Sequence, residues 1–94
     1  MDNYHEPAKD LSKNTRSITR ALLSFKEEIE AVDWYQQRID QEENSSLKKI
    51  LIHNMKEEME HASMTLEWLR RNMDGWNEQL TKYIFSKAEI TDIE

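Results

Sequence analysis

The sequence contains no cysteine, one glycine and one proline among its 94 residues. The lack of cysteine excludes disulfide bonds and thiolate metal sites, and it is compatible with the cytosol without fixing the compartment. The scarcity of glycine and proline removes most turn-forming residues, so long helices are the expected structure. Uninterrupted apolar runs are short, as in the segment 50–52, and we recognise neither a signal peptide nor a membrane span.

The charge balance is acidic, with a formal net charge of −6. Nucleic acids and anionic membranes carry the same sign of charge, so we expect neither as the main partner. An acidic surface instead suits cations. The length allows one small domain at most, and we assign residues 1–94 to a single all-α domain.

The pattern of apolar and polar residues predicts three helices, over about residues 7–42, 46–73 and 76–85. Pro7 can open the first helix, because a first helical residue has no need of its N–H. Asn44 or Ser45 can cap the second helix. Gly75 can adopt the left-handed conformation that follows a helix end. We predict no structure for residues 86–94.

The apolar faces of the two long helices are wider than a single partner helix can cover. A lone antiparallel hairpin would leave much of this surface in water, so we expect association. The simplest closed arrangement is a ferritin-like four-helix bundle made of two hairpins. The faces comprise Ile18, Ala21, Leu22, Phe25, Ile29, Val32, Tyr35 and Ile39 in the first helix, and Leu47, Leu51, Met55, Met59, Ala62, Leu66, Leu69 and Met73 in the second.

Two glutamates interrupt these apolar faces. Glu28 stands in the stripe of the first helix, Glu58 stands near the middle of the stripe of the second, and His61 borders the latter. A buried carboxylate without a partner costs several kcal/mol, so it requires a proton, a cationic side chain or a metal. No lysine or arginine lies in either stripe near these glutamates.

An antiparallel hairpin brings these residues to one level, because Glu28 and Glu58 are equally distant from Glu43 in the expected turn. A twofold partner would double the set to four glutamates and two histidines, the ligand set of di-iron carboxylate bundles. Glu-x-x-His alone is a weak signal, but the third ligand at matching height strengthens it. Carboxylate and imidazole ligands suit iron or manganese, with zinc, cobalt or calcium able to substitute or to occupy secondary sites.

Two further clusters lie on outer faces of the predicted helices. Each is more typical of a solvated polar surface than of a metal site, although the second could bind a metal weakly. The clusters are Glu27, Glu30 and Trp34 in the first helix, and His53, Glu57 and Glu60 in the second.

Three stretches resemble the encapsulated ferritins, the short ferritin-like proteins that are packaged inside encapsulin shells. The resemblance extends from about His5 to Phe85. The stretches are EEIEAVDWY at 27–35, the group His53-Asn54, Glu57-Glu58 and Glu60-His61-Ala62, and MTLEWLRR at 64–71.

The resemblance implies a helical hairpin that forms a homodimer with a ferroxidase centre, and dimers that assemble into a ring-shaped decamer. It implies that Glu28, Glu58 and His61 of both subunits are the iron ligands. By the same resemblance, Trp34 and Tyr35 form an aromatic pair beside the centre. The Tyr35 hydroxyl could hydrogen-bond a ligand, although an ordinary core tyrosine is an equal alternative.

The family also implies that Glu27 and Glu30 form a metal-attracting site on the way to the centre. The implied activity is oxidation of Fe(II) to Fe(III) by O₂, with the iron mineralising inside a cytoplasmic encapsulin nanocompartment. Family members usually continue into a targeting peptide or are fused to the shell protein. This sequence ends at Glu94 without such a segment, so the expected localisation rests on the resemblance alone.

Two alternative functions stay open. One is a helical interaction module whose buried glutamates pair with basic residues of a partner. The other is a different di-metal carboxylate enzyme, such as a manganese catalase or an oxygenase. A substrate pocket would favour the second, and a chain of this length has little material for one.

Overall fold

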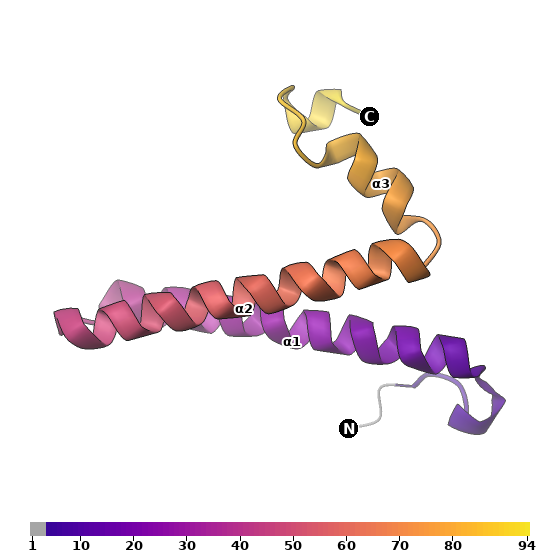
Figure 1. Ribbon diagram of the computed structural model, residues 1–94, viewed down its shortest axis with the longest axis horizontal. Coiled ribbons are helices and arrows are strands. Elements are labelled where there is room, and N and C mark those ends of the chain that lie inside the picture. Colours follow the sequence, from indigo (N-terminus) through magenta and orange to yellow (C-terminus); the bar gives the residue numbers. More distant parts are fainter. Residues whose placement is uncertain (1–3) are drawn as a thin grey trace.

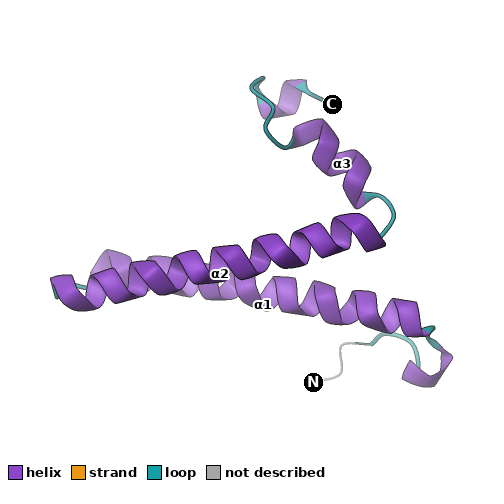
Figure 2. Ribbon diagram, in the orientation of Figure 1, coloured by secondary structure: helices purple, strands orange, loops and turns teal. Residues whose placement is uncertain are grey.

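The computed structural model describes residues 4–94 as two long antiparallel helices followed by a short one (Figure 1). Within these residues there is no β-strand, as Figure 2 shows, and no helix is long and apolar enough to cross a bilayer. The all-α fold class and the hairpin with a short C-terminal helix are confirmed. The elements are α1 (Lys13–Gln41), α2 (Ser45–Asn72), α3 (Trp76–Tyr83) and the 3₁₀ turns Ala8–Asp10 and Ile90–Asp92.

Helix α1 begins at Lys13, and the start that we predicted at Pro7 is wrong. Ser12 caps the helix, with its side-chain oxygen accepting a hydrogen bond from the Thr15 amide at 3.0 Å. Pro7 instead opens the short 3₁₀ turn, in which its carbonyl accepts from the Asp10 amide at 2.9 Å. Ser12 hydrogen-bonds an amide of the first turn that has no partner within the helix, whereas a proline is only compatible with a helix start. The serine therefore decides where the helix begins.

The connection between α1 and α2 is short and held by its own side chains. Of the two predicted caps, Asn44 serves, because its side chain accepts from the Leu47 amide at 2.9 Å. The Glu42 carboxylate accepts from the Glu43 amide at 3.0 Å and from the Asn44 amide at 3.3 Å. This tight connection fixes the antiparallel register of the two helices.

The ends of the other helices differ slightly from the prediction. Helix α2 ends at Asn72, and Gly75, which precedes α3, has a φ of 102°. Helix α3 ends at Tyr83 and not at Phe85, whose φ of 63° is incompatible with helix continuation.

The hairpin leaves many of its apolar side chains only partly covered. Within residues 4–94 only Ala62 and Leu69 are buried. The radius of gyration is 17.1 Å, whereas a compact domain of this length has about 13 Å. This surface supports the expected association with further copies. Large apolar side chains that remain exposed are Ile29, Trp34, Leu47, Ile50, Met59, Met64, Trp68, Ile84, Phe85 and Ile90.

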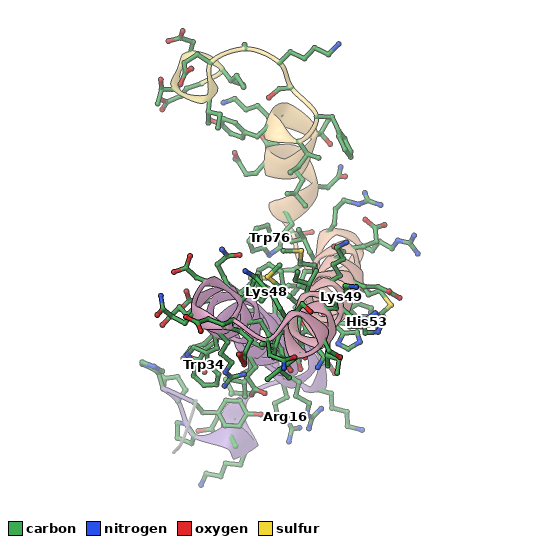
Figure 3. The ribbon with its side chains drawn as sticks, turned by 90° about the vertical axis from the view of Figure 1, so that its left-hand side faces the viewer. Arg16, Trp34, Lys48, Lys49, His53 and Trp76 are labelled. Carbon is green, nitrogen blue, oxygen red and sulfur yellow. The ribbon has the colours of Figure 1, made fainter. Side chains whose placement is uncertain are left out.

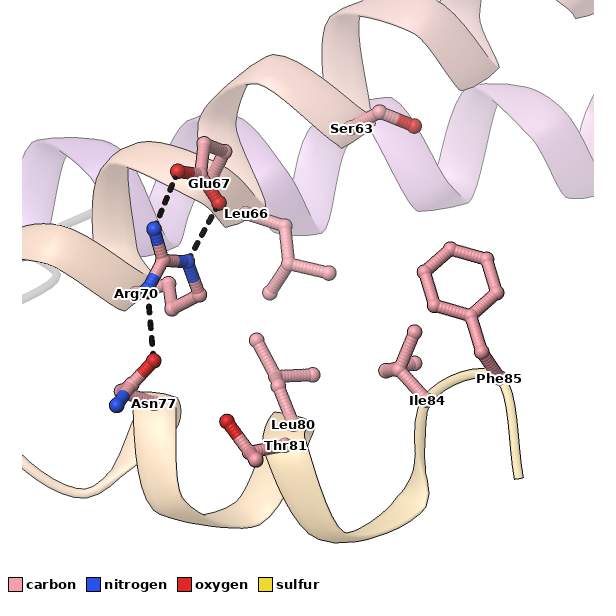
Figure 4. A pocket seen from close by; sticks show the side chains of 9 residues that line it. All are labelled: Ser63, Leu66, Glu67, Arg70, Asn77, Leu80, Thr81, Ile84 and Phe85. Carbon is pink, nitrogen blue, oxygen red and sulfur yellow. Dashed lines mark hydrogen bonds and ion pairs between the residues drawn. The ribbon is translucent and has the colours of Figure 1, made fainter.

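A polar cluster ties α3 to the end of α2. Arg70 donates two hydrogen bonds to the Glu67 carboxylate, at 2.6 and 2.7 Å, and a third to the Asn77 side chain at 2.6 Å (Figure 4). Arg71 donates to Glu67 at 2.6 Å. Beside this cluster, Leu66 and Leu80 line a groove of ≈ 610 Å³ between the two helices. The hydrogen bonds from Arg70 and Arg71 lower the pKa of Glu67 from 4.5 to about 2.

The lowered pKa predicts an acid-sensitive contribution of Glu67 to stability. The charged carboxylate stabilises the fold above about pH 4.5, and this contribution is lost as the pH falls towards 2. We expect Glu67→Gln to lower the free energy of unfolding at neutral pH by a small amount, because water screens exposed ion pairs. The difference from wild type should shrink between pH 4.5 and 2.

Urea unfolding followed by circular dichroism at stepped pH measures this difference. Glu78→Gln is the matched control, because it removes the same charge from the exposed surface of α3. A difference between wild type and Glu67→Gln that stays constant down to pH 2 would contradict the assignment.

Candidate metal centre

The predicted ligands differ from the neighbouring acidic residues in their burial. Glu28 on α1 and Glu58 and His61 on α2 are half-buried. The other acidic residues of the predicted sites are exposed, namely Glu27, Glu30, Glu57 and Glu60. We call the region where the apolar faces of α1 and α2 meet the seam. Glu28, Glu58 and His61, which interrupt the apolar pattern of the sequence, belong to it.

Glu58 and His61 approach each other on one face of α2. His61 Nδ1 lies 3.7 Å from Glu58 Oε2, a spacing of one helical turn, and the two side chains are 45% and 28% exposed. This distance is too long for a good hydrogen bond. A carboxylate oxygen and an imidazole nitrogen at this separation can bind one cation together, or form an ion pair when the histidine is protonated.

Glu28 is linked across the hairpin to Thr65, a residue that sequence reasoning missed. The Thr65 hydroxyl lies 2.9 Å from Glu28 Oε1 and 3.0 Å from the backbone carbonyl oxygen of His61. The available signal was spacing, because Glu58, His61 and Thr65 follow one another at intervals of three and four residues on α2. A threonine within a helix carries no metal-binding signature of its own, so the sequence did not single it out.

A single chain does not bring a complete ligand set together. Glu58 contacts His61, and Glu28 contacts Thr65 one turn further along α2. Over residues 4–94, no group of three or more histidine, aspartate or glutamate side chains is arranged to hold a metal ion. The three-ligand centre thus stays a prediction, and its completion requires ligands from a second copy or movement of Glu28.

The predicted aromatic pair lies on α1. Trp34 is 50% exposed, whereas Tyr35 is half-buried. The guanidinium carbon of Arg38 lies 5.4 Å from the centre of the Tyr35 ring, within the range of a cation–π contact. A hydrogen bond from Tyr35 to a metal ligand stays a prediction.

The second outer cluster is partly assembled. His53 Nε2 lies 3.5 Å from Glu57 Oε1, with the side chains 71% and 48% exposed. Glu60, three residues further along α2, is exposed and is one of the residues that line a shallow hollow on this helix. In the end-on view, His53 and Trp34 lie on opposite sides of the hairpin (Figure 3). The exposure of the His53 and Glu57 side chains is typical of a solvated surface. A weak metal site at these two residues stays a prediction.

The donor set of the half-buried face fits iron. Two carboxylates and one imidazole offer oxygen and nitrogen donors, which suit divalent first-row metals with mixed O/N coordination. The three side chains are half-buried, and Ala62, one of the two buried residues, directly follows His61. Partial removal from water strengthens the attraction between a carboxylate and a cation.

Comparisons with known proteins identify relatives over almost the whole chain. The EncFtn-like family model matches residues 3–87. A protein of Thermotoga maritima named ferritin-like protein is 56% identical over 93 residues, which cover 99% of this chain and 82% of that protein. An encapsulated ferritin-like protein of Rhodospirillum rubrum is 52% identical over 99% of this chain, which spans 66% of that relative's length. A crystal structure of a Nitrosomonas europaea protein matches with a TM-score of 0.90 and 46% identity, covering 95% of this chain and 98% of that one.

Proposed function

The chain belongs to the EncFtn-like family, and from this premise we propose that it is an encapsulin-associated ferroxidase that oxidises Fe(II) to Fe(III) with O₂. The observation that carries the proposal is that Glu28 on α1 and Glu58 and His61 on the facing helix α2 are half-buried, in positions where the helical pattern calls for apolar residues. Fe(II) is the substrate, and each ion loses one electron to O₂.

The roles of the three side chains follow from their chemistry. Glu28 and Glu58 supply anionic oxygens, which bind Fe(III) more strongly than Fe(II) and so favour oxidation. His61 supplies a neutral nitrogen that adds affinity without adding charge. Together with the same residues of a second copy, these side chains would hold a pair of iron ions, and the protein would contribute the position and electrostatic surroundings of the ions.

The proposed centre requires two copies of the chain. One hairpin supplies two carboxylates and one imidazole, and a twofold partner doubles the set around a pair of ions. The exposed apolar side chains of α1 and α2, among them Ile29, Leu47 and Met59, supply the surface that such a dimer would bury. We propose that dimers assemble further into a ring, a decamer by family resemblance, and that an encapsulin shell receives the iron mineral.

The direct test is aerobic addition of Fe(II) to purified protein. Absorbance from Fe(III) reports oxidation, and measurement of bound metal gives the stoichiometry. We expect oxidation faster than in buffer, with two iron ions bound per dimer. If the protein binds no iron and Fe(II) is oxidised no faster than in buffer, the result would favour the helical interaction module instead.

Single substitutions of the ligands should remove most of this activity. Glu58→Ala or His61→Ala deletes two ligands from each centre, because both subunits contribute. Loss of a residue that only orients a metal ligand lowers metal affinity or activity about 10- to 100-fold. Loss of a ligand itself should lower the oxidation rate by at least this factor. Stopped-flow absorbance measures it.

The variants should remain helical by circular dichroism. Glu43→Ala removes a charge from the connection between the helices and serves as the matched control. Oxidation at the wild-type rate in either ligand variant would place the centre elsewhere.

Assembly should depend on metal. Without metal, the proposed interface gathers four carboxylates in a poorly solvated setting, where their charges repel one another. A cation that binds only the dimer must stabilise the dimer by mass action. We expect anaerobic Fe(II) to shift metal-stripped protein to a larger size in sizing chromatography, and an unchanged profile at dilute concentrations would contradict this linkage.

Glu27 and Glu30 should affect the arrival of iron and not its oxidation. Both are exposed on α1, and long-range attraction of Fe(II) by such charges weakens with ionic strength. We expect wild type to lose more of its initial rate in high salt than the double variant Glu27→Ala/Glu30→Ala does. The measurement is oxidation at low Fe(II) in low and high salt.

Two outcomes would contradict this assignment. Complete loss of activity would make Glu27 and Glu30 ligands. Equal rates under all conditions would return them to an ordinary solvated surface.

A further inference from the structure

Thr65 joins the two long helices at the level of the proposed centre. Its hydroxyl oxygen lies 2.9 Å from Oε1 of Glu28, a contact between residues 37 positions apart in the sequence. The same oxygen lies 3.0 Å from the backbone carbonyl oxygen of His61. Both interactions are partly buried. One side chain therefore lies within hydrogen-bond distance of the Glu28 carboxylate and of the backbone of the turn that carries His61.

The location of Thr65 makes this contact well defined. Ala62 and Leu69, at 5% and 0% exposure, lie on the same face of α2, on either side of Thr65. Threonine is restricted at χ1 in a helix, and its hydroxyl commonly approaches the carbonyl four residues earlier. The turn that carries His61 thus fixes the place of the hydroxyl, and the packed seam directs it at α1.

The hydroxyl has one hydrogen for two acceptors. A hydrogen bond to an ionised carboxylate is stronger than one to a neutral carbonyl, so the Glu28 oxygen is the preferred acceptor when its carboxylate is charged. Glu28 then has Oε1 held towards α2, whereas Oε2 has no hydrogen bond among the described residues. A cation that approaches this seam meets a carboxylate with one oxygen already fixed.

We propose that Thr65 is a positioning residue that orients Glu28 for metal binding. The proposal rests on the proposed function of Glu28 as a ligand. A glutamate side chain has several rotatable bonds, and restricting them before the cation arrives reduces the entropy lost on binding. The link also ties the position of Glu28 on α1 to the His61 turn of α2. Thr65 itself contributes no ligand in this arrangement.

The test compares two substitutions that separate the hydroxyl from the shape of the side chain. Thr65→Val keeps the branched shape and removes the hydroxyl, whereas Thr65→Ser keeps the hydroxyl. Thr81→Val is the matched control, because it makes the same chemical change on the exposed surface of α3. Circular dichroism and thermal unfolding establish that each variant is folded.

The readout is anaerobic Co(II) binding by titration calorimetry, which is independent of oxidation. The visible spectrum of the bound Co(II) reports its coordination. Loss of an outer partner of a metal ligand costs about 10- to 100-fold in metal affinity. We expect Thr65→Val to bind Co(II) about 10-fold more weakly than wild type and to show an altered spectrum. Thr65→Ser and Thr81→Val should bind as wild type does.

Two results would overturn the positioning role while leaving the proposed function intact. One is unchanged Co(II) affinity in Thr65→Val, even if its thermal stability falls, which would make Thr65 a structural link only. The other is equal weakening in Thr65→Val and Thr65→Ser, which would assign the effect to packing of the methyl group. Failure of wild type to bind Co(II) would overturn the proposed function, and the positioning role with it.

Discussion

Two carboxylates lie among apolar side chains where the two long helices of this protein face each other. Glu28 and Glu58 occupy positions where the helical pattern calls for apolar residues, and the hairpin keeps both half-buried. Burial of a charge without compensation is costly. Thr65 compensates part of this cost at Glu28, and His61 stands near Glu58 at 3.7 Å. A bound cation would compensate the remaining negative charge of these carboxylates.

The same seam accounts for the incomplete burial of the chain. A hairpin whose central face carries acidic groups has a small apolar core by itself, and within residues 4–94 it buries two side chains, those of Ala62 and Leu69. Exposed apolar residues such as Ile29, Met59 and Met64 border this region. A second copy would cover this surface and supply further ligands in one step. Folding, assembly and metal binding are therefore coupled in the proposed account.

Much of this arrangement could be predicted from the sequence, because it follows from periodicity. The hairpin and the contrast between Glu28 and its exposed neighbours depend on which face of a helix a residue occupies. The start of α1 was mispredicted because Pro7 permits a helix whereas Ser12 caps one. Thr65 was missed because its role depends on a contact across 37 residues, which no local pattern encodes.

Anomalous diffraction at the iron edge, from crystals grown anaerobically with Fe(II), would locate the metal ions. We expect two iron ions at a dimer interface, coordinated by Glu28, Glu58 and His61 of both copies. Iron found only at exposed sites such as His53 and Glu57, with none between Glu28 and Glu58, would contradict it.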